Sequence, residues 1–181
     1  PEQLDSLEIG YLGDWREWRA SLDVRLFDEK IHNRTFKIDT GDASLGHSTR
    51  PIQNVHIQGI EYQFKWQPFE TTRVIFNQAY AKIDSDYLAS ALAISSPDLL
   101  APRRSQDITD FTEHSMPRRA SSVLLIQKLP FGLDFSVAGY WQDKMKWSTT
   151  TWSPKYHRFD ARLGYPFRSG GLSGEIAFNV Q

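Results

Sequence analysis

Histidine is the residue in this chain best suited to acid–base chemistry or metal binding, and five are present, at His32, His47, His56, His114 and His157. No pair has the HExxH spacing, which would place two imidazoles and a carboxylate on one face of a helix. The chain also contains no cysteine, so thiolate ligands, cysteine nucleophiles and disulfides are excluded. The histidine pattern therefore predicts no metal site, and a solvated loop histidine is the simpler interpretation of His32 and His47.

Other catalytic signatures are missing as well. The chain has no GxSxG, no P-loop and no GxGxxG, which are the usual cues for hydrolases and nucleotide binding. Asp160 and Glu175 lie on polar strand faces near arginines, a pattern that favours ion pairs along a wall over catalytic acids. We therefore expect no catalytic residue, no cofactor and no enzymatic activity.

Arginines form the one group with binding potential. The segment SPDLLAPRRSQDITDFTEHSMPRR holds two arginine pairs, and guanidinium groups bind anions through two parallel hydrogen bonds. With two histidines, they make up the candidate ligand-binding set: Arg103, Arg104, His114, Arg118, Arg119 and His47. Contact with lipid phosphates, or solubility alone, is the competing explanation for these arginines.

These residues need elements to position them, and period-two alternation predicts about eight β-strands. The stretch LDFSVAGYW is typical: Leu133, Phe135, Val137 and Trp141 fall on one side, with Asp134 and Ser136 on the other. The predicted strands cover approximately residues 3–12, 18–28, 55–66, 72–83, 118–129, 133–147, 156–167 and 172 onward. A phase change in the third strand predicts a bulge near residues 58–59.

The connections between these strands alternate strictly in length. Short turns are expected around GDWRE, QPFET, PFG and RSGG, with longer connections over residues 30–54, 84–117 and 148–155. In an up-and-down sheet, all short turns then lie at one end and all long loops at the other. One or two helical turns are expected within the second long loop, over residues 86–94.

Alternation alone does not say whether the apolar face meets lipid or a dry core. Aromatic residues gather at both strand ends, as they do at the two interfaces of a membrane. Together with the sorted connections and the family resemblance given below, these aromatic ends lead us to expect a lipid-facing set consisting of Leu133, Phe135, Val137, Trp141, Phe159, Leu163, Ile176 and Phe178.

Composition limits the alternatives. The chain has 181 residues, a mean hydropathy of -0.49 and a formal net charge of -1. Its length indicates a single domain or part of one, no window is apolar enough for a spanning helix, and the charge gives no support for a nucleic-acid partner.

The ordered set of motifs resembles the C-terminal part of TonB-dependent outer-membrane receptors. LEIGYLGDWREWRASLDVRLFDEKIHN looks like their strand–turn–strand, NVHIQGIEYQFKWQP like their GxE strand, and LPFGLDFSVAGYWQDKMKW and RFDARLGYPFR like later strands. The resemblance implies an all-β, antiparallel up-and-down transmembrane β-barrel of about 22 strands. Residues 1–181 would then be a single partial domain supplying about eight strands, without the plug domain or the terminal strand.

The function implied by the resemblance is import of a scarce ligand, such as a ferric siderophore-like chelate, with energy from TonB. The expected location is the bacterial outer membrane. The expected partners are outer-membrane lipids and lipopolysaccharide, TonB through the missing N-terminal part, and a small-molecule ligand such as a metal chelate. Two alternatives stay open: a small eight-stranded outer-membrane channel or structural barrel, and a soluble lipocalin-like ligand-binding barrel.

Overall fold

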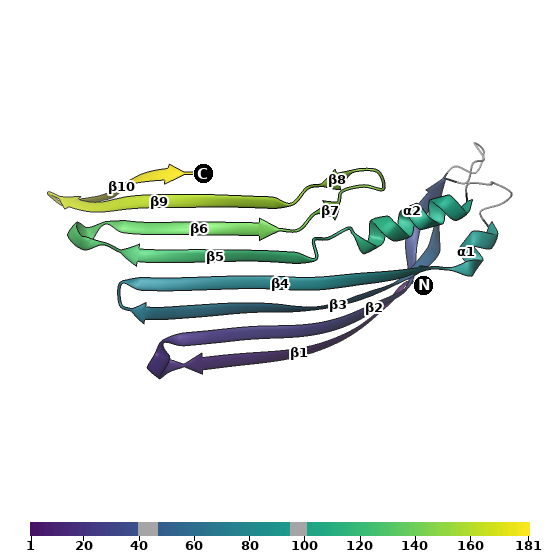
Figure 1. The fold of residues 1–181 in the computed structure, drawn as a ribbon, viewed down its shortest axis with the longest axis horizontal. Coiled ribbons are helices and arrows are strands. Elements are labelled where there is room, and N and C mark those ends of the chain that lie inside the picture. The colour runs from purple at the N-terminus through teal and green to yellow at the C-terminus, as the bar shows by residue number, and fades with distance from the viewer. Residues whose placement is uncertain (40–46, 95–100) are drawn as a thin grey trace.

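The computed structural model of this chain describes residues 1–39, 47–94 and 101–181, with the side chains of 37–39, 47–48, 92–94 and 101–104 outside that description. Its main feature is one eight-stranded antiparallel sheet in the order β1-β2-β3-β4-β5-β6-β9-β10 (Figure 1). The strands are β1 Gln3–Trp15, β2 Ala20–Asp39, β3 His47–Phe69, β4 Thr72–Tyr87, β5 Arg119–Lys128, β6 Asp134–Gln142, β9 Tyr156–Ser169 and β10 Leu172–Val180. Each strand pairs with the next one of the sheet along the chain, so the predicted all-β, up-and-down arrangement of eight strands is confirmed.

The short connections fall where they were predicted. They contain the 3₁₀ turns η1 (Arg16–Trp18) and η2 (Pro130–Gly132), the pair at residues 70–71, and Gly170–Gly171. Both of these last glycines have positive φ, 56° and 87°, as a two-residue hairpin turn requires. Figure 1 shows all four at one end of the sheet, with the helices and the small β7–β8 hairpin (Met145–Lys146 and Trp152–Ser153) at the other.

The first long connection is mostly strand, which corrects the loop expected over residues 30–54. β2 runs to Asp39 and β3 starts at His47. The register shifts between Ile31 and Thr35, and Asn33 adopts a φ of 56° there. This bulge changes the phase of the apolar residues, so the alternation is hidden in the sequence.

The bulge predicted near residues 58–59 is wrong. Pairing between β2 and β3 is uninterrupted from Val55–Ile31 to Trp66–Ala20. Val55 and Ile57 lie on the polar face of the sheet, and Val55 is buried there. The change of phase in the sequence thus marks a covered patch at the long-loop end of that face.

Two helices occupy the second long connection. α1 (Ala89–Ile94) lies within the helical turns expected over residues 86–94, whereas Asp86 itself belongs to β4. α2 (Ala101–Glu113) was not predicted, because its sequence is mostly polar and its apolar positions are few. Among its described side chains, those of residues 105–113, Ile108 and Thr112 are buried.

The small hydrophobic core lies at this helical end. Ile52, Ala91 and Ile108 are buried together, and Phe36, Tyr87 and Leu88 pack against them. Elsewhere the sheet is one layer thick, and β10 is exposed along its whole length. In the described residues, no helix has the length and apolar character needed to cross a membrane.

Candidate functional site: a two-faced wall and its mouth

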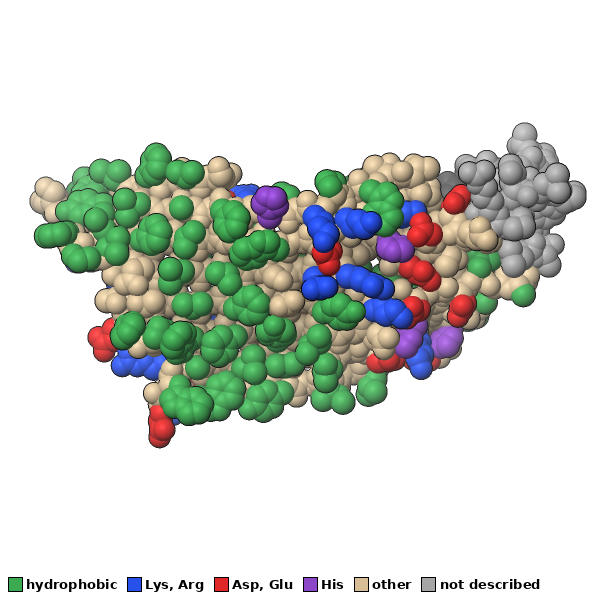
Figure 2. Space-filling model, viewed as in Figure 1, with side chains coloured by type: hydrophobic (Ala, Val, Ile, Leu, Met, Phe, Trp, Pro, Cys, Tyr) green, Lys and Arg blue, Asp and Glu red, His purple; other side chains and the backbone are tan. Residues whose placement is uncertain are grey.

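Strand register divides the sheet into an apolar and a polar face, because paired residues in an antiparallel sheet point to the same side. One register row illustrates the apolar face: Leu22, Phe64, Phe76, Val123, Gly139 and Phe159. Figure 2 shows hydrophobic side chains spread over this face toward the short-turn end. Many of them are exposed, including Ile9, Phe159 and Phe178.

The predicted lipid-facing residues share this apolar face. Phe135 pairs with Leu163, which pairs with Phe178, while Tyr165 pairs with Ile176. Val137, Trp141 and Phe159 follow the same alternation, and Leu133 precedes β6 in the same phase. Their contact with lipid remains a prediction.

An aromatic pair on this face depends on a glycine. The rings of Trp141 and Phe159 meet edge to face, with centroids 5.5 Å apart. Both lie over Gly139, where an added Cβ would overlap the Trp141 ring. The glycine therefore leaves the room in which the two rings pack on neighbouring strands.

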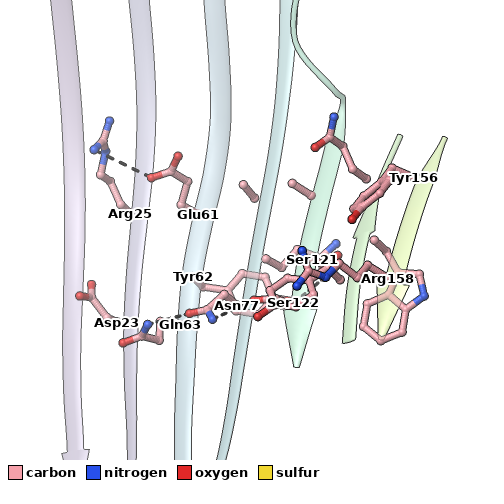
Figure 3. A pocket seen from close by; sticks show the side chains of 16 residues that line it. Asp23, Arg25, Glu61, Tyr62, Gln63, Asn77, Ser121, Ser122, Tyr156 and Arg158 are labelled. Atoms are coloured by element: carbon pink, nitrogen blue, oxygen red, sulfur yellow. Dashed lines mark hydrogen bonds and ion pairs between the residues drawn. The ribbon is translucent and has the colours of Figure 1, made fainter. Parts of the chain in front are cut away.

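The polar face carries paired charges and an amide ladder (Figure 3). Arg25 lies 3.3 Å from Glu8 and 3.9 Å from Glu61. Gln63 donates to Asn77, and Asn77 donates to Ser122, over 2.6 and 3.0 Å. The ion pairs expected for Asp160 and Glu175 are present, with Arg158 at 2.6 Å and Arg162 at 2.7 Å.

A shallow, open hollow lies on this face between β2 and β9. Its polar lining includes Asp23, Arg25, Glu61, Gln63, Asn77, Ser122, Tyr140 and Arg158. Both of its arginines already have carboxylate partners. Chemically, the hollow suits a polar partner that exchanges hydrogen bonds with it, and it offers little net positive charge to a free anion.

The long-loop end of the sheet, which we call the mouth, is covered on one side by α2, which contacts the ends of β3 and β4 there. Gln53 on β3 is buried and donates to Thr112 over 2.8 Å. The backbone N–H of Ser85 on β4 donates to Glu113 over 3.1 Å. Gln53 and Ser85 belong to the polar face, so the helix lies on that side of the sheet.

The opposite side of α2 contacts the β7–β8 hairpin. Asp110 forms an ion pair with the buried Lys146, and the Lys146 backbone donates to the His114 carbonyl over 2.7 Å. The His114 ring lies edge-on to Trp152, with centroids 5.3 Å apart. The hydrogen bond from Lys146, together with the positive charge of Lys146 and His114, lowers the pKa of Asp110.

The candidate ligand-binding residues are dispersed at this end. His114 directly follows the last residue of α2 and takes part in the contact with Trp152 just described. Arg118 and Arg119 are both exposed; Arg119 begins β5 on the apolar face, in register with Tyr80, whereas Arg118 precedes the strand. Arg103 and Arg104 belong to α2 and His47 begins β3, but their side chains lie outside the described residues.

Two further histidines pair with carboxylates on the apolar-face side, a feature that the sequence did not reveal. His56 lies 2.8 Å from Asp28, and His32 lies 3.2 Å from Asp5. Strand pairing brings them together across β1, β2 and β3. In the described part of the chain, no group of three or more histidines and carboxylates is arranged to hold a metal ion.

Comparison with known proteins gives consistent matches. The family model described as TonB dependent receptor-like, beta-barrel matches residues 1–181. The structure is similar to the ferric citrate transporter FecA in its unliganded form, with 16% identity, a TM-score of 0.68, and coverage of 99% of this chain and 26% of that one. It is also similar to the siderophore receptor PiuA from Acinetobacter baumannii, with 17% identity, a TM-score of 0.64, and coverage of 91% and 22%.

The ferric preacinetobactin receptor BauA from Acinetobacter baumannii is a third similar structure, with 13% identity, a TM-score of 0.66, and coverage of 99% and 25%. No curated protein matches the chain. The chain thus spans about a quarter of the length of these solved structures.

Proposed function

Because this chain belongs to the TonB-dependent receptor β-barrel family, we propose that it forms part of the wall and mouth of an outer-membrane receptor that imports a scarce small ligand. The observation that carries the proposal is the two-faced sheet, with its apolar side exposed and its polar side lined by paired charges. A large membrane barrel needs this arrangement, with lipid outside and a wet lumen inside. The polar face would then meet a plug or a passing ligand.

The ligand would bind at the mouth, where α2 and the β7–β8 hairpin meet. Similar solved structures are described as receptors for siderophores and as a ferric citrate transporter, so a ferric siderophore-like chelate is the proposed ligand class. Arg103, Arg104, His114, Arg118, Arg119 and His47 remain the candidate ligand residues. Energy would come from TonB, and the receptor would carry out no covalent chemistry.

The large barrel is preferred over the two smaller ones. The described sheet places β1 and β10 at its two edges without pairing them to each other. An eight-stranded channel or a lipocalin-like barrel needs that pairing for closure. An open sheet with two unpaired edges is what a segment of a much wider barrel requires.

Uptake by the full-length receptor tests the proposal. Cells that depend on this receptor should accumulate iron from one of a panel of ferric chelates, and only when TonB is present. Arg103→Gln with Arg104→Gln should lower that uptake about tenfold or more, because two anion-binding groups are lost. Arg16→Gln with Arg168→Gln, at the short-turn end, removes the same charge and should leave uptake unchanged. Equal uptake with and without the receptor, for every chelate tested, would contradict the proposal.

A further inference from the structure

A belt of charge borders the apolar face at its long-loop end. In β2, Leu26 is followed on this face by Asp28 and Lys30. Lys30 pairs in register with His56, and His56 with Asp84. Figure 2 shows this belt as a diagonal band of charged and histidine side chains beyond the hydrophobic area.

The belt runs obliquely to the strands. Leu26, Ile60 and Tyr80 occupy one register row, and Arg119 occupies the same row in β5. One row closer to the short turns, Trp141 pairs with His157 in β9. The boundary thus moves along the strands from β2 to β9, as expected where strands are tilted roughly 35–45° in a membrane barrel. The belt then lies at a single depth, along the edge of the apolar band.

Positive charge is in excess at one point of this belt. Asp143 lies 3.8 Å from Arg119 and 3.6 Å from Lys155, so two cations share one carboxylate. The side chains of Arg119 and Lys155 are 68% and 75% exposed, whereas that of Asp143 is 29% exposed. Two donors are therefore free to reach a further anion from this face, directly beyond Trp141 and His157.

We propose that Arg119 and Lys155 form a binding site for the phosphate head group of a lipid in the outer leaflet. The site continues the apolar face, so acyl chains can lie on the face while a phosphate meets the two cations. Exposed Tyr80 and Trp141 beside it are residues suited to the membrane–water interface. The inference rests on the proposed function, because it takes the apolar face to be in contact with lipid.

A soluble anion fits this site less well than a lipid. Arg119 lies in the register row of Tyr80 on the apolar face, on the other side of the sheet from the polar hollow, so we assign Arg119 to the lipid and not to the set that binds the imported ligand. Its neighbours toward the short turns are apolar, which favours an occupant with an apolar part. A diphosphorylated glycolipid such as lipid A supplies both the charge and the acyl chains.

Native mass spectrometry of the full-length receptor in detergent micelles, titrated with bisphosphorylated lipid A, tests this site. Arg119→Gln with Lys155→Gln should weaken lipid A binding about tenfold, since each cation near such a surface contributes measurably. Asp143→Asn should act in the opposite direction and tighten binding several-fold, because it removes the carboxylate that the two cations share. Raised salt should weaken binding by the wild type and abolish the difference between these variants.

Matched controls separate the outcomes. Arg16→Gln with Arg168→Gln removes two exposed cations at the short-turn end and should leave binding unchanged. Dephosphorylated lipid A should bind no better than phosphatidylcholine.

Two results would overturn the site: unchanged lipid A binding by the variant that lacks Arg119 and Lys155, or weaker binding by Asp143→Asn. Displacement of lipid A by inorganic phosphate at equal concentration would contradict a lipid occupant. A receptor that enters micelles and takes up its chelate yet fails these tests refutes only this inference, whereas a receptor that does not enter micelles refutes both.

Discussion

Lys146 is a buried charge at the mouth, and its main partner is one carboxylate. Its side chain is 8% exposed and pairs with Asp110 on α2, which is about half exposed. A second acceptor, the Thr149 carbonyl, lies 3.4 Å away. Loss of Asp110 would leave a largely buried ammonium with two weak partners, this carbonyl and the Trp152 ring, whose centroid lies 5.4 Å from Nζ, which is costly in a region of low dielectric.

Asp110→Asn should therefore loosen α2 from the β7–β8 hairpin by about 1–3 kcal/mol of local stability. Hydrogen exchange of the α2 amides measures this loosening directly. Asp107→Asn, on an exposed position of the same helix, is the matched control and should leave exchange unchanged. Equal exchange in both variants would show that the ion pair does not hold the helix.

Acid should act like the Asp110 substitution. The pKa of Asp110 is lowered by Lys146 first and His114 second, so the folded state favours the ionised carboxylate. The stabilisation is fully present above the unfolded pKa of about 3.9 and is lost as pH falls through the lower folded value. Exchange in α2 should rise below about pH 4 in the wild type, and should change less over that range in Asp110→Asn.

Residue contacts were predictable only within regular strands. The partners of Asp160 and Glu175 could be expected from alternation, because an arginine two residues away or on the next strand shares their face. Asp110 and Lys146 are far apart in sequence and both lie outside the main sheet. Their contact follows from how α2 and the β7–β8 hairpin pack, which no periodicity encodes.

At the scale of elements, Gly59 fixes how closely β3 and β4 approach Phe27 of β2. A Cβ at this position would overlap the Tyr80 carbonyl oxygen and lie 2.6 Å from the Phe27 ring. Gly10 of β1 offers a contrast, since a Cβ there would be in ordinary contact at 3.9 Å from the Val24 carbonyl. A larger side chain therefore fits at residue 10 without any shift of its neighbours, whereas at residue 59 it does not fit.

Gly59→Ala should destabilise the sheet by about 1–3 kcal/mol, because the backbone or the Phe27 ring must shift. Gly10→Ala should be close to neutral in the same assay. Unfolding of the full-length receptor in denaturant, followed by tryptophan fluorescence, gives both values. A similar free energy of unfolding for the two variants would contradict the close approach at Gly59.

Elements with a clear period were predicted well and interrupted ones were not. The eight strands and four short turns followed from alternation and turn residues. The extension of β2 and β3 was missed because the bulge at Asn33 changes the phase. α2 was missed because its stability comes from contacts with β3, β4 and the hairpin, and its polar sequence resembles a loop.

For the whole molecule, the orientation of the two faces decides the function. Leu163→Arg places a charge on the apolar face and should cost about 2–4 kcal/mol of barrel stability near the middle of a membrane. Ala177→Arg, on the polar face beside Phe178, the partner of Leu163, is the matched control and should cost much less. Comparable losses for both variants, measured by unfolding of the full-length receptor in lipid vesicles, would contradict a lipid-facing Leu163.

The sequence predicts which strand residues share a face, but it does not predict what the apolar face contacts. A row such as Phe135, Leu163 and Phe178 is apolar whether it meets lipid or a dry core. The assignment of the apolar face to lipid rests on three observations: the short and long connections lie at opposite ends of the sheet, aromatic residues gather at both strand ends, and the chain belongs to the TonB-dependent receptor β-barrel family. The identity of the ligand was beyond prediction, because no period in the sequence fixes how the candidate residues of α2 and of the long-loop ends of β3 and β5 lie relative to one another.

Accessibility along β6 tests the central claim of a lipid outside and a wet lumen inside. These 181 residues contain no cysteine, so spin labels can be placed at Phe135→Cys, Ser136→Cys, Val137→Cys and Tyr140→Cys in the full-length receptor in lipid vesicles, with any cysteine elsewhere in that receptor replaced by serine. We predict high oxygen accessibility at residues 135 and 137, and high accessibility to a water-soluble paramagnetic reagent at residues 136 and 140. The reverse pattern, or equal accessibility at all four positions, would contradict the account.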